Sequence, residues 1–155
     1  MDDRLFRDAM GKFATGITVV TADYDNEIMG MTVNAFMSIS LDPKLIAISI
    51  DESASLYNKL TKIKKFGVSI LTEQQKDLSM IFAKQMEMDR EIEFIRQDNI
   101  PVIKDSLVTI SSHVKDMVKA GDHMIFIAEV SDIVINTGDP LIYANSQYQS
   151  LKPLE

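Results

Sequence analysis

The sequence predicts a mainly β, largely antiparallel domain with two or three peripheral helices. Six or seven segments rich in Val, Ile, Thr and aromatic residues are separated by Gly, Pro, Asn and Asp turn signals. The 155 residues are enough for one domain with a sizeable core, and 46% hydrophobic with 25% charged residues is ordinary globular composition. These observations favour a single domain over residues 1–155, built as an antiparallel barrel or sandwich decorated by helices.

The first half of the chain mixes helical and strand patterns. Apolar residues at helical spacing predict helices, and dense β-branched runs predict strands. The expected elements are a helix over 3–14 ended by Gly16, strands over 17–22, 30–40 and 45–50, and a helix over 53–65. Ser53 is the expected N-cap of the last helix, with Leu56, Leu60 and Ile63 as its buried stripe. A turn over 23–27 joins the first two strands into a hairpin.

The second half of the chain also alternates between helical and strand patterns. Thr72 and Gln75 match a capping box ahead of a helix carrying Leu78, Ile81 and Phe82. Residues 84–99 are crowded with both signs of charge and show no period, so we expect a surface excursion or a solvated helix there. Strands are expected over 66–71, 107–115, 122–130 and 141–143.

Charge and composition exclude several classes of function. The net charge of −7 and pI of about 4.8 disfavour a nucleic acid or an anionic membrane as partner. The absence of cysteine excludes disulfides, thiolate nucleophiles and Cys-ligated metals. No basic segment followed by an apolar run opens the chain, and no stretch approaches the roughly 18 apolar residues of a membrane span. A cytoplasmic domain is expected.

A run of uncharged polar residues marks the stretch from Gly30 to Pro43. Thr32, Asn34, Ser38 and Ser40 are spaced by two or four, so on one continuous strand they share a face. Short hydroxyls and a carboxamide at fixed points suit a neutral heteroaromatic ring and its phosphate tail. The alternative is an edge strand whose solvent face is polar.

Few catalytic motifs are present. The chain has no Gly-x-Gly-x-x-Gly, Walker A, His-Glu-x-x-His or Gly-x-Ser-x-Gly sequence. Its two histidines, His113 and His123, lie on different expected strands, which disfavours a catalytic metal, and His113 is read as structural or solvated. Hydroxyls, an Asn, aromatics and one histidine suit a site where a bound cofactor carries the chemistry. Hydride transfer from a nicotinamide to a flavin fits, because it needs positioning and no protein nucleophile.

Five segments in one order resemble the flavin reductase family with the FMN-binding split-barrel fold. These proteins are the short reductase components of two-component flavin monooxygenases and their relatives. The resemblance runs from about Leu5 to Tyr148. The five segments are Phe13–Thr21, Gly30–Pro43, Phe66–Leu71, Gly121-Asp122-His123 and Gly138–Tyr143.

The resemblance implies an NAD(P)H:flavin oxidoreductase that reduces FMN or FAD and supplies reduced flavin to a partner oxygenase. It also implies a homodimer with each flavin in a groove near the subunit interface. The expected hydride donor is NADH or NADPH. The sequence distinguishes neither the two donors nor FMN from FAD, and it does not tell a tightly bound flavin from an exchanging one.

The resemblance also assigns residues to the site. The ring is expected to lie against Thr32, Val33, Asn34 and Ala35, with Ser38 and Ser40 nearby. The ribityl chain and phosphate are expected to contact Ser49, Ile50, Asp51, Ser53, Ala54 and Ser55. The last three lie at a helix start that favours an anion. Phe82, Ala83 and Tyr148 complete the cofactor-binding set. His123 is expected to face the nicotinamide and position it, and no metal ligand is assigned.

Some positions depart from the family pattern. Ser55 and Leu56 stand where a basic residue and a Thr are common, and Ala128 replaces a common Gly. These differences keep two alternatives open. One is an FMN-binding electron-transfer flavoprotein reduced by another protein, and the other is a non-catalytic flavin-binding module.

Overall fold

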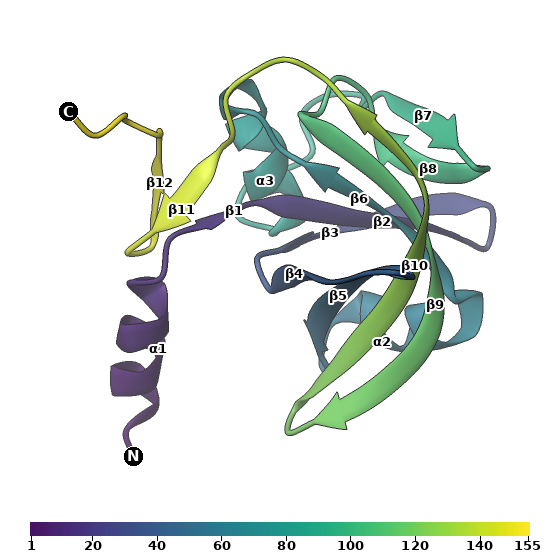
Figure 1. Ribbon diagram of the computed structural model, residues 1–155, viewed down its shortest axis with the longest axis horizontal. Helices are drawn as coiled ribbons and strands as arrows, with labels where there is room; N and C mark the ends of the chain where they lie inside the picture. The colour runs from purple at the N-terminus through teal and green to yellow at the C-terminus, as the bar shows by residue number, and fades with distance from the viewer.

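The computed structural model describes residues 1–155 and confirms the mainly β, antiparallel class (Figure 1). Its main sheet has seven strands in the order β3-β2-β6-β9-β10-β5-β4, and every neighbouring pair is antiparallel. The strands are β2 (Thr18–Tyr24), β3 (Glu27–Val33), β4 (Phe36–Leu41), β5 (Lys44–Asp51), β6 (Lys65–Ile70), β9 (Val108–Ala120) and β10 (His123–Ile135). The last two form a longer hairpin than the sequence predicts.

The two edge strands of this sheet, β3 and β4, are consecutive in the chain. Only Asn34 and Ala35 separate them, so the sheet has to curl to bring its edges together. No hydrogen-bonded ladder joins β3 to β4, so the sheet stays open and the expected barrel is not closed. The prediction of one strand from Gly30 through Ser40 is wrong, because a bond from the Phe36 amide to the Asn34 carbonyl (2.9 Å) turns the chain.

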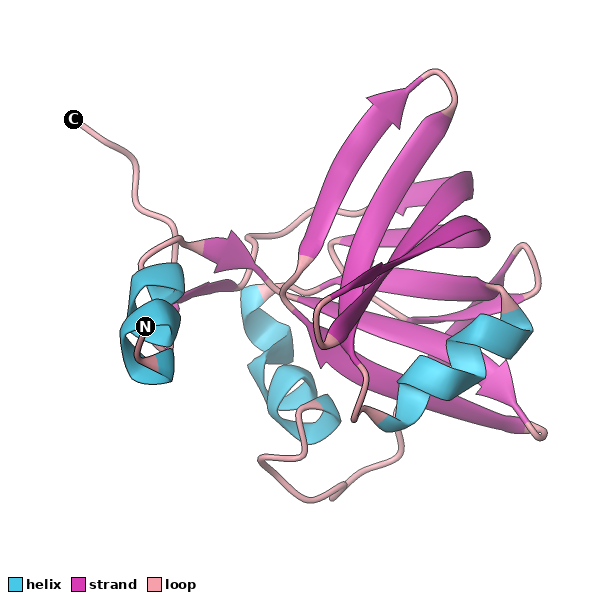
Figure 2. Ribbon diagram, turned by 90° about the horizontal axis from the view of Figure 1, so that it is seen from below, coloured by secondary structure: helices cyan, strands magenta, loops and turns pink.

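Helix α2 (Ser55–Ile63) fills the inside of the curl. It contacts β2, β3, β5 and β6, which belong to both halves of the sheet (Figure 2). Leu56 and Leu60 are buried as predicted, in one cluster with Phe66 and Phe126, and Ile63 is partly buried. The N-cap is Ala54 rather than the predicted Ser53, whose hydroxyl is bonded to Asp51 instead.

A second, smaller core lies under helix α3 (Lys76–Phe82). The predicted capping box forms at the 3₁₀ turn Glu73–Gln75, where the Thr72 amide donates to Gln75 Oε1 at 3.0 Å. The hairpin of β7 (Phe94–Gln97) and β8 (Ile100–Ile103) was not predicted. Charged residues around β7 concealed it, and its turn rests on the positive φ of Asp98 and Asn99. All four residues of β8 are buried.

The N-terminal helix α1 (Asp3–Gly11) stands apart from the main sheet in Figure 1, beside a small sheet. It is capped by Asp2 and buries none of its residues, and it ends at Gly11 rather than near Gly16. The small sheet consists of β1 (Thr15–Gly16), β11 (Ile142–Ala144) and β12 (Gln147–Gln149), in the order β1-β11-β12. No helix in the structure has the length and apolarity needed to cross a membrane.

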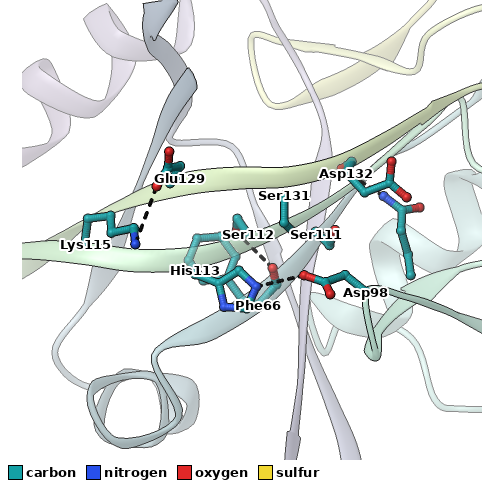
Figure 3. Close-up of polar contacts among 10 residues, drawn as sticks. Phe66, Asp98, Ser111, Ser112, His113, Lys115, Glu129, Ser131 and Asp132 are labelled. Carbon is teal, nitrogen blue, oxygen red and sulfur yellow. Dashed lines mark hydrogen bonds and ion pairs between the residues drawn. The ribbon is translucent and has the colours of Figure 1, made fainter. Parts of the chain in front are cut away.

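A polar network ties the β7–β8 turn to the main sheet (Figure 3). His113 Nε2 lies 2.9 Å from Asp98 Oδ2, and the hydroxyls of Ser111 and Ser131 are 2.8 Å apart. The bond from His113 lowers the pKa of Asp98, with a smaller contribution from a bond to Ser131. These contacts connect elements of the fold, which agrees with the structural reading of His113.

Candidate functional site

A pocket of about 210 Å³ opens between the end of β3, the end of α3 and the β11–β12 hairpin. No side chain in its lining is charged. The lining residues are Ile17, Thr32, Asn34, Ser79, Ala83, Gln85, Tyr143 and Tyr148. Four of the predicted cofactor-binding residues, Thr32, Asn34, Ala83 and Tyr148, therefore meet in one place.

A second hollow of about 230 Å³ adjoins this pocket and shares Ile17 and Asn34 with it. It too is free of charged residues. Its further lining residues are Thr15, Gly16, Thr18, Phe36 and Ile70. We call the two hollows together the uncharged groove. Asn34 stands at their junction, so the chain crossing between the two sheet edges forms part of the groove.

Hydrogen bonds hold one wall of the groove together. The Thr32 hydroxyl donates to the Ser79 carbonyl at 2.7 Å, and the Ser79 and Tyr148 hydroxyls lie 2.9 Å apart. The rings of Tyr143 and Tyr148 pack edge to face with centroids 5.4 Å apart. These contacts fix α3 against β3 and β12. Asn34, by contrast, is exposed and its carboxamide has no partner within the chain, so it is free to bond a ligand.

Phe82 supports this wall from behind. A Cβ at Gly30 would lie 2.6 Å from the Phe82 ring, so this approach depends on the glycine. The ring also packs edge to face on Phe94, with centroids 6.5 Å apart. Phe82 is absent from the pocket lining, whereas its neighbour Ala83 is present. The ring of Phe82 thus packs behind the pocket wall, and its contact with a flavin stays a prediction.

Several other predicted residues lie at a charged cluster where β5 ends and β10 begins. His123 lies directly opposite Asp51 in the ladder, and His123 Nδ1 is 2.8 Å from Asp122 Oδ1. Asp51 Oδ1 accepts bonds from the Ser53 amide and hydroxyl, both at 2.8 Å. Those bonds, the amide first, lower the pKa of Asp51. We call Asp51, Glu52, Asp122 and His123 the charged end.

The uncharged groove and the charged end are neighbours along the backbone. The Ser49 amide donates to the Ala35 carbonyl at 3.0 Å, which places the residue after Asn34 beside the strand that leads to Asp51. Val33 and Ile50 are buried core residues, so only their backbone can meet a ligand. Ala54 and Ser55 follow at the start of α2.

Ser38 and Ser40 do not join the groove. They lie on β4 opposite Ile46 and Leu45, beyond the break in the strand, and a bulge separates them. They were grouped with Thr32 because a single strand was assumed. The chain passes to the other edge of the sheet at Asn34, so the shared face does not exist.

In the first of the two hollows, four lining residues were missed: Ile17, Ser79, Gln85 and Tyr143. Tyr143 and Tyr148 flank a short turn in the closing hairpin, and that pair of aromatics was an available signal. Ser79 sits inside a helical pattern and Gln85 in the charged segment, so nothing local distinguishes them.

The groove suits a flat, uncharged heteroaromatic ring. Aromatic and aliphatic walls with a few fixed hydroxyl and amide groups are usual for such ligands. Thr32, Asn34 and Tyr148 offer polar atoms without charge, and Ala83 leaves room. The donor set therefore fits the isoalloxazine ring of a flavin.

The comparisons with known proteins agree with this fit. The chain matches the family model "Flavin reductase like domain" over residues 10–152. It is 38% identical over 159 residues to the NADH-dependent flavin reductase StyB of Pseudomonas fluorescens, covering 99% of this chain and 92% of that one.

Solved structures show the same similarity. Flavin reductase PheA2 in its native state superposes with a TM-score of 0.96 at 50% identity, covering 99% of this chain and 100% of that chain. The Streptomyces globisporus NADH:FAD oxidoreductase SgcE6, in complex with NAD and FAD fragments, gives a TM-score of 0.90 at 28% identity. That match covers 97% of this chain and 94% of the other.

Proposed function

The chain belongs to the flavin reductase family, and we propose that it is an NADH-dependent reductase transferring hydride to FMN or FAD. We assign this activity to residues 1–155 as one reductase domain. The observation that carries the proposal is the uncharged groove, in which hydroxyl, amide and aromatic groups converge without a nucleophile or an acid–base pair. Such a site binds and orients, and the bound flavin supplies the electron-accepting ring.

In the proposed site the groove holds the flavin ring. Asn34 bonds a polar edge of the ring with its free carboxamide, and the backbone from Thr32 to Ala35 lines it. Tyr143 and Tyr148 give the ring an apolar wall whose position is fixed through Ser79. Holding the ring in one orientation is the chain's contribution to rate, because two reacting rings have to meet at short range.

His123 is proposed to contact the nicotinamide. Its imidazole is half-buried, and its bond to Asp122 limits how the ring turns. Hydride transfer leaves no proton to remove at the donor carbon, so the imidazole acts as a hydrogen-bonding wall and not as a base. It lies at the charged end, two ladder positions from Ser49.

A homodimer is also proposed. The long apolar strands β5 and β10 are interior strands of the sheet, so their edges give no reason for a second copy. The apolar side chains that stay exposed lie on α1, β4 and the far end of β10, and a second copy would cover them. They include Leu5, Phe6, Met37, Leu41, Val134 and Ile135. Light scattering with flavin present tests this, since a monomer would contradict it.

The partner of the reaction is proposed to be a flavin-dependent oxygenase. The relatives include reductase components of the trigonelline and 4-hydroxyphenylacetate monooxygenases. We propose that reduced flavin leaves the groove for such a partner, in keeping with the absence of a charged clamp on the ring.

The test is steady-state oxidation of NADH and NADPH with added FMN or FAD. We expect flavin-dependent loss of nicotinamide absorbance, faster with NADH. A protein that binds flavin but ignores both nucleotides, yet takes electrons from another reductase, is an electron carrier. One that binds flavin and passes no electrons is a binding module.

A further inference from the structure

We propose that Asp51, Asp122 and His123 form a binding site for a divalent transition metal such as Zn²⁺, and that a metal bound there blocks the use of NADH. The effect on NADH rests on the proposed function, in which His123 contacts the nicotinamide. Three features of the charged end support the site: the spacing of the donor atoms, the backbone that holds them and the charge around them.

The three side chains direct one imidazole and two carboxylates to a common point. One ligand atom of each lies within 4.8 Å of the other two, and His123 Nδ1 is 2.8 Å from Asp122 Oδ1. Zinc binds nitrogen and oxygen at about 2.0–2.2 Å, so two ligand atoms on one ion are roughly 3.0–3.5 Å apart. Small side-chain rotations reach that spacing. An imidazole among the donors favours Zn²⁺ over Mg²⁺ and Ca²⁺, which take oxygen ligands.

The ladder between β5 and β10 fixes the backbone beneath these donors. His123 lies directly opposite Asp51, and the Glu52 amide donates to the Asp122 carbonyl at 2.9 Å. Asp51 Oδ1 accepts bonds from the Ser53 amide and hydroxyl, both at 2.8 Å, whereas Oδ2 has no partner within the chain. Metal-binding carboxylates are commonly oriented by such a bond from a residue that is not itself a ligand. The donors therefore need little ordering before they bind.

The charge around the site suits a dication. Asp51, Glu52 and Asp122 bring three carboxylates to the charged end. Lys119 pairs with Glu52, and no lysine or arginine forms an ion pair with Asp51 or Asp122. Two carboxylates and a neutral imidazole balance the charge of one divalent ion, and opposite charges at this range attract.

The chain contains a second His–Asp pair that serves as a comparison (Figure 3). His113 Nε2 lies 2.9 Å from Asp98 Oδ2, and both side chains are partly exposed, like those of the charged end. Its further neighbours are Ser131 and the cation Lys65, and no second carboxylate or imidazole joins it. A metal there would have two protein ligands and a repelling charge. The additional carboxylate of Asp51 therefore distinguishes the charged end.

A metal at the charged end would withdraw His123 from its proposed task. An imidazole nitrogen that binds a metal cannot bond the nicotinamide, and water ligands on the ion occupy the approach. None of the three ligands lines the uncharged groove, so the walls of the groove stay in place. We therefore expect the metal to compete with NADH.

The first experiment measures metal binding without turnover. Calorimetric titration of the flavin-free protein with Zn²⁺, and absorption titration with Co²⁺ as a visible probe, should each show one site per chain. We expect His123→Ala and Asp51→Asn each to weaken Zn²⁺ binding about tenfold or more, and His113→Ala to bind Zn²⁺ as the wild type does. Mg²⁺ at the same concentration should give no binding heat. Absence of Zn²⁺ binding, or equal binding by the wild type and His123→Ala, would overturn the proposal.

The second experiment measures NADH oxidation at saturating FMN with and without Zn²⁺. At a Zn²⁺ concentration about ten times the dissociation constant, we expect the apparent KM for NADH to rise about tenfold with kcat nearly unchanged, which is the pattern of competition for binding. EDTA should restore the rate, and His113→Ala should be inhibited as the wild type is. Inhibition that persists in His123→Ala, or that excess NADH does not relieve, would overturn the proposal.

The metal site and the proposed function fail differently. If Zn²⁺ binds through the three residues but the protein never oxidises NADH, the proposed function is wrong and the blocking of NADH falls with it, whereas the metal site stands. If NADH reduces flavin while Zn²⁺ neither binds nor inhibits, only the metal site is wrong.

Discussion

The uncharged groove contains Asn34, and the charged end lies at the end of the strand whose Ser49 bonds Ala35, yet the two regions are built on different principles. The groove is held by buried packing and neutral bonds, such as Thr32 to Ser79 at 2.7 Å. The charged end is held by exposed contacts such as the ion pair of Glu52 with Lys119. Neutral groups in a partly buried wall keep their positions with little desolvation cost, whereas exposed ion pairs add little stability.

The difference in construction suits the two regions to different roles in binding. The rigid, neutral region is suited to hold a ring in one orientation, and the solvent-facing region is suited to a second reactant that arrives and leaves. The predictions below act on one region at a time.

The largest effect is expected from disturbing the wall of the groove. Gly30→Ala places a Cβ 2.6 Å from the Phe82 ring, so the ring has to move from its packed position on the wall. Such overpacking costs about 1–3 kcal/mol in unfolding free energy and should weaken flavin binding as well. Denaturant unfolding and fluorescence titration measure the two effects. Gly11→Ala, where no atom lies within 4 Å of the new Cβ, is the control and should leave flavin binding unchanged.

Those two effects can also be tied to Phe82 directly. A smaller side chain in Gly30→Ala/Phe82→Leu should recover part of the lost stability, because it removes the clash. No recovery would contradict the packing account of the wall.

A smaller loss is expected from the hydroxyl bridge of the same wall. Tyr148→Phe leaves the buried Ser79 hydroxyl without its partner at 2.9 Å, at a cost of about 1–2 kcal/mol. Tyr143→Phe removes a hydroxyl that makes no bond in the chain, so it should cost much less. Thermal unfolding of the two variants makes the comparison, and equal losses would count against the bridge.

The smallest effect on stability is expected from Asp51 at the charged end, and this effect depends on pH. Because the folded pKa of Asp51 is lowered by its bonds from Ser53, the ionised form stabilises the fold above the ordinary Asp pKa of about 3.9. That contribution is lost as the pH falls through the lowered value. Melting temperatures of the wild type and Asp51→Asn should therefore differ slightly at neutral pH and converge in acid. A gap that widens in acid would show the opposite sign.

Local patterns predicted most of the fold because they depend on near neighbours. The Thr72–Gln75 capping box, the Leu56 and Leu60 stripe and the β2–β3 hairpin are all short-range features, and the structure confirms them. The family resemblance is confirmed over residues 10–152.

What was missed depends on contacts between distant parts of the chain. The break at Asn34 follows from the sheet order, which puts β3 and β4 at opposite edges, and no local residue pattern encodes that. Ser79 and Tyr148 meet across 69 positions of sequence. Strand β8 was not predicted, although it pairs with β7 and all four of its residues are buried.

The separate roles of the uncharged groove and the charged end are tested most directly by measuring flavin binding and NADH oxidation in two variants. Asn34→Ala removes the free carboxamide of the groove, and His123→Ala removes the imidazole of the charged end. Flavin dissociation constants come from fluorescence quenching, and NADH KM and kcat from steady-state oxidation. His113→Ala, which alters only the contact with Asp98, is the control for loss of a histidine.

We expect each variant to lose a different property. Asn34→Ala should weaken flavin binding by about 1 kcal/mol, roughly fivefold. His123→Ala should keep its flavin affinity and lose about tenfold in kcat/KM for NADH, which corresponds to about 1.4 kcal/mol. If His123→Ala mainly loses flavin binding, or if Asn34→Ala binds flavin as the wild type does, the two regions do not have the separate roles assigned to them.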